Sequence, residues 1–220
     1  MDWKDFWAPI TLSIQISIIA SIIMMILSVF FAWRMAHARF IGKSLVDTVL
    51  LLPLVLPPTV IGFLLLVTLG RRSWIGRLYE WVFGGQIVFT WEAAVIAAIV
   101  VAFPLAYRAM RAGFEGVERE LEDSARAMGA SEWQVFRHIS IPLSVRSLTA
   151  GYILGFARGL GEFGATLMIA GNIPGKTQTI PTAIYVAIDG GSMQLAWALS
   201  GTMVVFSFLM LLLANRFSKA

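Results

Sequence analysis

The sequence predicts an all-α integral membrane protein with about five transmembrane helices, forming a single domain over residues 1–220. Apolar residues make up 58% of the 220 residues, charged residues make up 14%, and the mean hydropathy is +0.79. This composition is too apolar for a soluble domain, and no polar stretch of the sequence is long enough to form one. Four apolar runs reach the roughly 20 residues that a helix needs to cross a bilayer, and a fifth comes close.

The composition argues against several functions. With no cysteine and two histidines, disulfides, thiolate chemistry and a histidine-based metal site are not expected. The basic residues behind the net charge of +4 lie beside apolar runs, not in a stripe with stacking aromatics, so nucleic acid is not an expected partner. We find no convincing catalytic constellation, and the stretch 170–177 has Ala170 where a phosphate-binding loop needs glycine. The chain is therefore predicted to be no enzyme and to hold no cofactor or metal.

The first two predicted spans differ in regularity. Span one, residues 10–33, is uncharged and carries serines at every fourth position, which favours close helix packing: Ser13, Ser17 and Ser21. Span two, residues 48–69, is interrupted by prolines and a glycine: Pro53, Pro57, Pro58 and Gly62. Because proline lacks a backbone donor, this helix must bend or unwind at membrane depth, and irregular backbone there indicates a lined pathway.

The remaining spans are predicted at residues 91–107, 147–169 and 195–215. Span four contains Arg158 and Glu162, which are four residues apart and can pair on one helix face. The favoured interpretation is an internal ion pair that holds span four against its neighbours. The alternative is that Arg158 meets an anion or gates its path. Glycines recur beside this pair, as in helices that approach closely within a bundle or a dimer: Gly151, Gly155 and Gly159.

Two shorter apolar stretches lie between the spans. Residues 74–83 are predicted to form a helix at the membrane interface, beside a group of three arginines: Arg71, Arg72 and Arg77. Residues 180–188 are too short to cross the membrane and are predicted to form a helix on the outer face, ended by Asp189 and Gly190.

Basic residues determine the expected orientation, since they are retained on the cytoplasmic side. With the charged stretch 114–142 inside, 11 of the 17 Lys and Arg residues are cytoplasmic, five are external, and Arg158 lies in the membrane. The N-terminus is then outside and the C-terminus is in the cytoplasm. The three arginines near residues 71–77 are the exception to the rule.

The charged stretch 114–142 is predicted to form two short helices. Apolar residues recur at steps of three and four, which predicts one amphipathic helix that ends near the last of them: Phe114, Val117, Leu121, Ala125 and Met128. Gly129 suits the end of this helix, and Ser131 with Gln134 has the spacing of a capping box for the next. Pro142 is expected to end the second helix. The stretch holds 6 of the 13 acidic residues, so we expect it to stay in water.

This stretch resembles the signature of the membrane subunits of bacterial binding-protein-dependent ABC importers. That signature reads glutamate-alanine-alanine, three residues, glycine, nine residues, isoleucine, one residue, leucine-proline. The matching residues here are Asp123, Ser124, Ala125, Gly129, Ile139, Ile141 and Pro142. Three of them depart from the signature: Asp123 replaces glutamate, Ser124 replaces alanine and Ile141 replaces leucine. Glu122 can also supply the carboxylate.

More of the chain resembles one subgroup, the molybdate permease subunits. The similar runs are residues 51–58, 156–165, 172–175 and 179–181, and the second of these runs is shared with sulfate permeases. The resemblance implies a permease subunit of an ATP-driven importer of a tetrahedral oxyanion, working by alternating access. Molybdate or tungstate is the expected substrate, and sulfate or thiosulfate is the alternative.

The resemblance also implies partners in the bacterial inner membrane and around it. These are the lipid bilayer, a second copy of the chain, two cytoplasmic ATPase subunits that bind ATP and magnesium, and a periplasmic or surface substrate-binding protein. Stretch 114–142 would be a cytoplasmic coupling loop between spans three and four that docks on the ATPase through these residues: Glu122, Asp123, Ser124, Ala125, Gly129, Ala130, Trp133, Phe136, Ile139 and Pro142. The translocation pathway or gate is expected at Pro57, Pro58, Thr59, Arg158, Glu162 and Thr166.

Two other classes of function remain open from the residues alone. One is an ion-coupled carrier that uses Arg158 and Glu162 as a charge relay, and the other is a helical membrane scaffold. ATP-dependent uptake distinguishes the importer from the carrier, which would run on a proton gradient without an ATPase.

Overall fold

The computed structural model describes residues 3–219, so the first two residues and the last residue of the predicted domain lie outside the described part. The described residues contain helices and no strand, which confirms the all-α class. Four of these helices are long and apolar enough to cross a membrane, and one bent pair supplies a fifth candidate. The helices are α1 (Trp3–His37), α2 (Lys43–Val55), α3 (Pro58–Leu69), α4 (Trp74–Phe83), α5 (Trp91–Glu115), α6 (Arg119–Ala127), α7 (Glu132–Val135), a π-helical turn (Phe136–Ser140), α8 (Ile141–Leu160), α9 (Gly164–Ala170), α10 (Ile180–Asp189) and α11 (Met193–Lys219).

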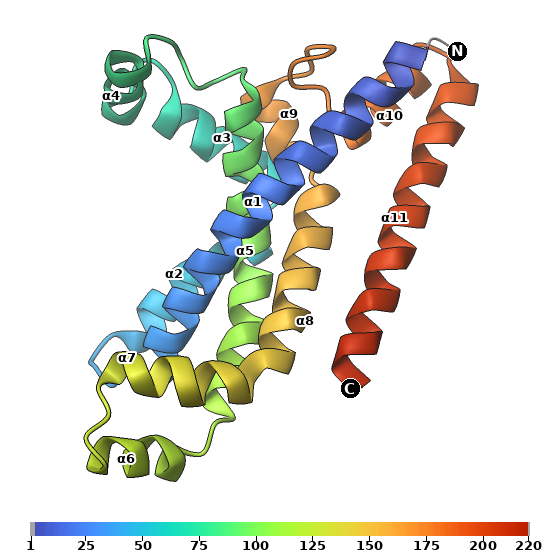
Figure 1. Ribbon diagram of the computed structural model, residues 1–220. Coiled ribbons are helices and arrows are strands. Elements are labelled where there is room, and N and C mark those ends of the chain that lie inside the picture. Colours follow the sequence, from blue (N-terminus) through green and yellow to red (C-terminus); the bar gives the residue numbers. More distant parts are fainter. Residues whose placement is uncertain (1–2, 220) are drawn as a thin grey trace.

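The centre of the fold is a bundle of α1, α5 and α8 (Figure 1). Helix α5 is largely buried and presents a row of alanines to its neighbours: Ala93, Ala94, Ala97, Ala98, Ala102 and Ala106. On α8, a Cβ added to Gly151 would lie 2.8 Å from Met110, and one added to Gly155 would lie 2.5 Å from Met24. These two glycines therefore permit close helix packing within the bundle, as predicted.

The serines of α1 are buried where this helix meets its neighbours. The backbone nitrogen of Ile180 donates a hydrogen bond of 2.8 Å to Ser13 Oγ, and Ser21 Oγ lies 3.2 Å from the hydroxyl of Tyr152. Helix α1 is thus tied to α10 near its start and to α8 near its middle. The prediction that these serines serve helix packing is confirmed.

The predicted bend in span two is present and sharp. Helices α2 and α3 meet at Leu56 and Pro57 and are bent by 113°. Because Pro57 and Pro58 lack backbone donors, a continuous helix would lose two hydrogen bonds there. The chain instead leaves α2 in an extended conformation and starts α3 with a proline in its first turn.

The prediction of one continuous span over residues 147–169 is wrong. Helix α8 ends at Leu160, and α9 begins at Gly164 after a non-helical break. Glu162 lies in this break and accepts a hydrogen bond of 2.8 Å from the backbone nitrogen of Ala165, so its side chain caps the first turn of α9. Span three also differs from its prediction, because α5 continues to Glu115 instead of ending near residue 107.

The two short helices between the spans are found where the sequence predicts them. Helix α4 covers Trp74–Phe83, and the hydroxyl of Ser73 caps it by accepting from the nitrogen of Gly76 at 2.8 Å. Helix α10 ends at Asp189 and is followed by Gly190. In Figure 1 both helices lie at the upper end of the molecule, whereas α6 and α7 lie at the lower end.

Candidate coupling and pathway sites

The charged segment at the lower end of the molecule is formed by α6, α7 and the π-helical turn (Figure 1). The prediction of one helix from Phe114 to Met128 is wrong, because Phe114 belongs to α5 and α6 begins only at Arg119. The chain turns at Gly116 between them. The apolar period continues across this turn because Phe114 and Val117 are both buried, although they lie outside α6.

The turn between α6 and α7 agrees with the prediction. Gly129 has a φ of 91°, a left-handed conformation that favours glycine. The backbone nitrogen of Ser131 donates to Gln134 Oε1 at 2.7 Å, and the nitrogen of Gln134 donates to Ser131 Oγ at 3.4 Å. These two bonds form the predicted capping box.

Pro142 does not end the second helix as predicted. The helix continues from Glu132 to Leu160, and Pro142 lies in the first turn of α8. The preceding turn, Phe136–Ser140, is π-helical, with the nitrogen of Ile141 donating to the carbonyl of Phe136. This wider turn accommodates a proline ring that would clash with the carbonyl four residues earlier in a regular α-helix.

A buried carboxylate joins this segment to the bundle. Only 1% of Glu122 is exposed, so the expectation that the whole segment stays in water is wrong at this residue. Ser140 Oγ donates to Glu122 Oε1 at 2.7 Å, and His37 Nε2 lies 2.8 Å from Glu122 Oε2. His37 Nδ1 also lies 2.9 Å from the carbonyl of Trp33. The ring of His37 therefore lies between a carbonyl of its own helix and the buried carboxylate of α6.

The neighbouring acid, Asp123, has a different position. Its side chain is exposed and accepts a hydrogen bond of 2.7 Å from Arg126 Nη1. Arg126 also donates to Glu132 from Nε at 2.7 Å and from Nη2 at 3.1 Å, which bridges α6 to α7. These hydrogen bonds to Glu132 are the main reason why the pKa of Arg126 is raised above its ordinary value. The two acids at the signature position are therefore separated, with Glu122 inside and Asp123 outside.

The outer side of the segment presents apolar side chains to its surroundings. Met128 is 83% exposed, Trp133 is 64% exposed, and Leu121 is also exposed. A cavity of about 330 Å³ lies between the two short helices, and its walls include Ala125, Ala130 and other coupling residues. The ten predicted coupling residues thus divide into three groups: buried Glu122 and Ala125; half-buried Ala130, Phe136 and Ile139; and exposed Asp123, Ser124, Gly129, Trp133 and Pro142.

The sequence reasoning missed His37 and Ser140, the partners of Glu122. His37 ends α1 and is 85 residues away from Glu122 in the chain. No local pattern connects two such positions. A polar residue in the last turn of a span was the only available signal.

The predicted pathway residues lie where the two interrupted spans meet. A Cβ added to Gly164 at the start of α9 would lie 3.0 Å from Pro58 Cβ at the start of α3, and one added to Gly62 would lie 2.6 Å from Met168 Cβ. The two breaks are therefore adjacent. Pro57 and Thr59 are exposed, Pro58 is half-buried, and Thr166 is buried.

The predicted ion pair of Arg158 and Glu162 is present. Arg158 Nη1 donates to Glu162 Oε2 at 2.8 Å, while the other carboxylate oxygen accepts from α9. The Glu162 side chain is buried, and a third of the Arg158 side chain is exposed. The pair therefore binds α8 to the break and leaves one side of the arginine accessible.

These features are those of a multi-pass membrane transport subunit. The chain belongs to the family described as binding-protein-dependent transport system inner membrane component, whose pattern matches residues 24–220. This result confirms the resemblance to importer membrane subunits that the signature in stretch 114–142 indicates.

Relatives and solved structures agree with this assignment. The chain is 53% identical to YvgM of Bacillus subtilis, named as a molybdenum transport system permease, over 94% of this chain and 92% of the relative. It is 50% identical to the molybdenum transport system permease protein ModB of Escherichia coli K12, over 83% of this chain and 80% of the relative. A crystal structure of a bacterial ABC transporter that imports the polysaccharide alginate matches all of this chain and 80% of its own, with a TM-score of 0.79 at 17% identity. That likeness concerns the fold.

Proposed function

We propose that this chain is the permease subunit of an ATP-driven importer of molybdate or tungstate, with residues 1–220 as its single membrane domain. The names of relatives at 46–53% identity support the substrate, since three of them are molybdenum permeases over most of both chains. One structural observation carries the ATP-driven mechanism. It is the bent segment of α6 and α7, with its exposed Met128 and Trp133 and the cavity between its helices.

In this proposal the bent segment docks on a cytoplasmic ATPase that binds ATP and magnesium. Exposed apolar residues at a protein end outside the membrane suit a protein interface better than a solvated surface. The hydrogen bonds of Glu122 to His37 and Ser140 then connect the docked segment to α1 and α8. A displacement of α6 by the ATPase is passed to the bundle through these contacts.

The assembly in this proposal has two copies of the chain, two ATPase subunits and a substrate-binding protein on the outer side. A solved relative of the fold, the alginate transporter, is described in complex with a substrate-bound periplasmic protein, with a TM-score of 0.76 at 18% identity. The bent segment and the end of α1 lie at one end of the bundle, and α4 and α10 at the other (Figure 1). This arrangement agrees with an external N-terminus and a cytoplasmic C-terminus.

The two adjacent helix breaks are the proposed place of the gate. Breaks at membrane depth are tolerated where they are covered by protein or line a cavity, and the meeting of Pro58 with Gly164 provides such a place. Arg158 is neutralised by Glu162, so the gate offers little net positive charge to an anion. Selection of the anion is then made by the binding protein, and the permease opens and closes by alternating access.

The test is uptake of labelled molybdate into right-side-out or reconstituted vesicles that contain the chain with its ATPase, with ATP inside and the binding protein outside. We expect uptake that requires ATP and is inhibited by excess tungstate more strongly than by excess sulfate. If excess sulfate inhibits uptake as strongly as excess tungstate does, the transporter belongs to the sulfate class instead. Uptake driven by a proton gradient without the ATPase would establish the ion-coupled carrier and refute the proposal.

A further inference from the structure

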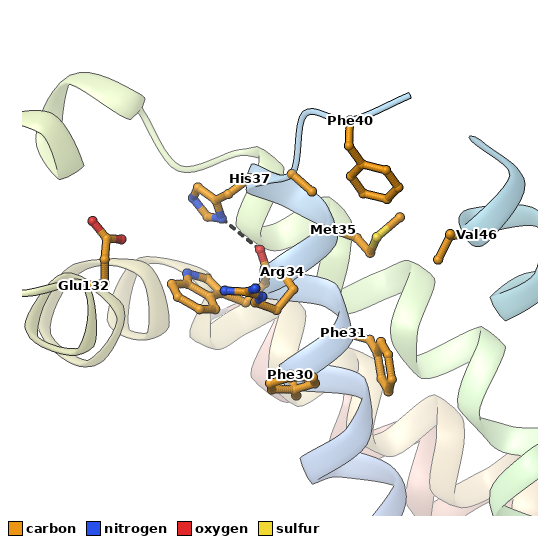
Figure 2. Close-up of a pocket in the computed structure, with 10 residues that line it drawn as sticks. Phe30, Phe31, Arg34, Met35, His37, Phe40, Val46 and Glu132 are labelled. Atoms are coloured by element: carbon orange, nitrogen blue, oxygen red, sulfur yellow. Dashed lines mark hydrogen bonds between the residues drawn. The ribbon is translucent and has the colours of Figure 1, made fainter. Parts of the chain in front are cut away.

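A second cavity lies at the end of α1, away from the gate and distinct from the cavity between α6 and α7. It has a volume of about 710 Å³, within the range of small-molecule sites, and curves around the last turns of α1 (Figure 2). Met35, Phe40 and Val46 lie on one side of the helix, and His37 and Glu132 lie on the other. One part of the cavity is therefore apolar and the other polar.

The polar part of the cavity carries net positive charge. Arg34 lines it, and Arg39 lies in the loop to α2 between Ala38 and Phe40, which both line it; the two arginines are exposed and form no ion pair with any carboxylate of the described residues. Glu132 does not cancel this charge, because Arg126 already binds both of its oxygens. The positive charge of these two arginines is thus available to a ligand.

The position of the cavity favours a ligand from the bilayer. Arg34 is the first charged residue after the apolar run of α1, which places the cavity at the level of the lipid headgroups. Phe30 and Phe40 in its wall are about half exposed, so the apolar part is open toward the hydrocarbon. A free inorganic anion would leave this apolar wall in contact with water, whereas an acyl chain would cover it.

We propose that this cavity binds an anionic phospholipid of the inner leaflet, with its phosphate at Arg34 and Arg39 and an acyl chain along Met35, Phe40 and Val46. Clusters of basic residues beside a span attract anionic headgroups. Because Glu132 lines the same cavity, the bound lipid contacts the start of α7, the second helix of the bent segment. Lipid bound here therefore stabilises the end of α1 against α7.

The experiment measures lipid retained by the transporter, purified with its ATPase in mild detergent, by native mass spectrometry. Phosphatidylglycerol and phosphatidylcholine with identical acyl chains are added in turn. We expect phosphatidylglycerol to bind more tightly and the Arg34→Gln/Arg39→Gln variant to lose about 25-fold in its affinity. This is about fivefold for each arginine, or about 1 kcal/mol apiece.

The control is Arg71→Gln/Arg72→Gln, which removes the same formal charge just before α4, the helix at the opposite end of the molecule, where Arg71 pairs with Glu80. It should bind phosphatidylglycerol as the unmodified protein does. Equal binding of the two lipids, or an equal loss in both double variants, overturns the proposal. Displacement of the lipid by inorganic phosphate at the same concentration would indicate an anion site only. A disulfide between two copies carrying Phe40→Cys would show that a second copy covers the cavity, which also overturns it.

Discussion

Replacing Glu122 with leucine should loosen the joint between the bent segment and the bundle. The change leaves the hydroxyl of Ser140, which is fully buried, and the Nε2 of His37 without their partner. An unpaired buried hydroxyl costs about 1–3 kcal/mol, and a hydrogen bond to a charged group is worth about 1.5–3 kcal/mol. Relief from burying the carboxylate offsets part of this loss. We therefore expect the free energy of unfolding to fall by about 2–4 kcal/mol.

Glu122→Gln is the matched control, because it keeps the shape and both hydrogen bonds. The amide oxygen can accept from Ser140, and the amide nitrogen can donate to a neutral His37. The charge is lost, together with the ion pair of Glu122 Oε2 and Arg126 Nη2 at 3.6 Å, and charge-assisted bonds are about twice as strong as neutral ones. This variant should lose about 1 kcal/mol, by the net value of an ordinary hydrogen bond.

The measurement is denaturant unfolding in detergent, followed by ATP-dependent uptake in vesicles. The leucine variant should retain ATP hydrolysis in the assembled complex but transport less per ATP consumed, since α6 is no longer bonded to α1. The glutamine variant should transport nearly normally. If the leucine variant unfolds at the same denaturant concentration as the unmodified protein and transports at full yield per ATP, the reasoning about this joint is refuted.

Three further variants test other parts of the structure. Gly62→Leu should cost about 1–3 kcal/mol and lower the yield of folded protein, because the new Cβ meets the backbone of α9 within 3 Å. Gly129→Val should cost about 1–2 kcal/mol, because it forces a branched side chain into a left-handed turn, and should abolish uptake while the protein still assembles. Arg158→Ala removes the partner of buried Glu162 and should lower the stability of the assembled protein by about 1–3 kcal/mol. The choice of substrate should not change.

Each of these variants has its own check. Gly201→Ala, at a helical glycine with open space around it, should leave the yield unchanged. Gly129→Asn, which tolerates the left-handed turn, should restore part of the uptake lost in the valine variant. An Arg158→Ala protein that assembles normally and transports nothing would show that the arginine acts on the anion and not as a structural partner.

The elements predicted well are those specified by neighbouring residues. The capping box of Ser131 and Gln134, the turn at Gly129 and the short helices α4 and α10 each depend on side chains within a few positions. The apolar runs likewise predict the long spans, since crossing a bilayer requires length and composition alone.

The features that were missed depend on contacts between distant residues or on exceptions to a local rule. The burial of Glu122 follows from His37 at the far end of α1, and no pattern near Glu122 indicates it. The break before α9 was missed because apolar residues lie on both sides of it, while Glu162 within it caps the new helix with a side chain that also binds Arg158. Pro142 was taken as a helix end because the rule assumes regular α-helical hydrogen bonds.

The π-helical turn determines the direction in which the side chains of α7 point relative to α8. An α-helix advances by about 100° per residue, so one additional residue in a turn rotates everything before it by that angle relative to everything after it. Trp133 therefore points outward in a direction that an uninterrupted helix from Glu132 to Leu160 would not give it. Removing one residue from Phe136–Ser140 would rewind the helix and swing the indole about a quarter turn around the axis, with every membrane-embedded contact of α8 left in place.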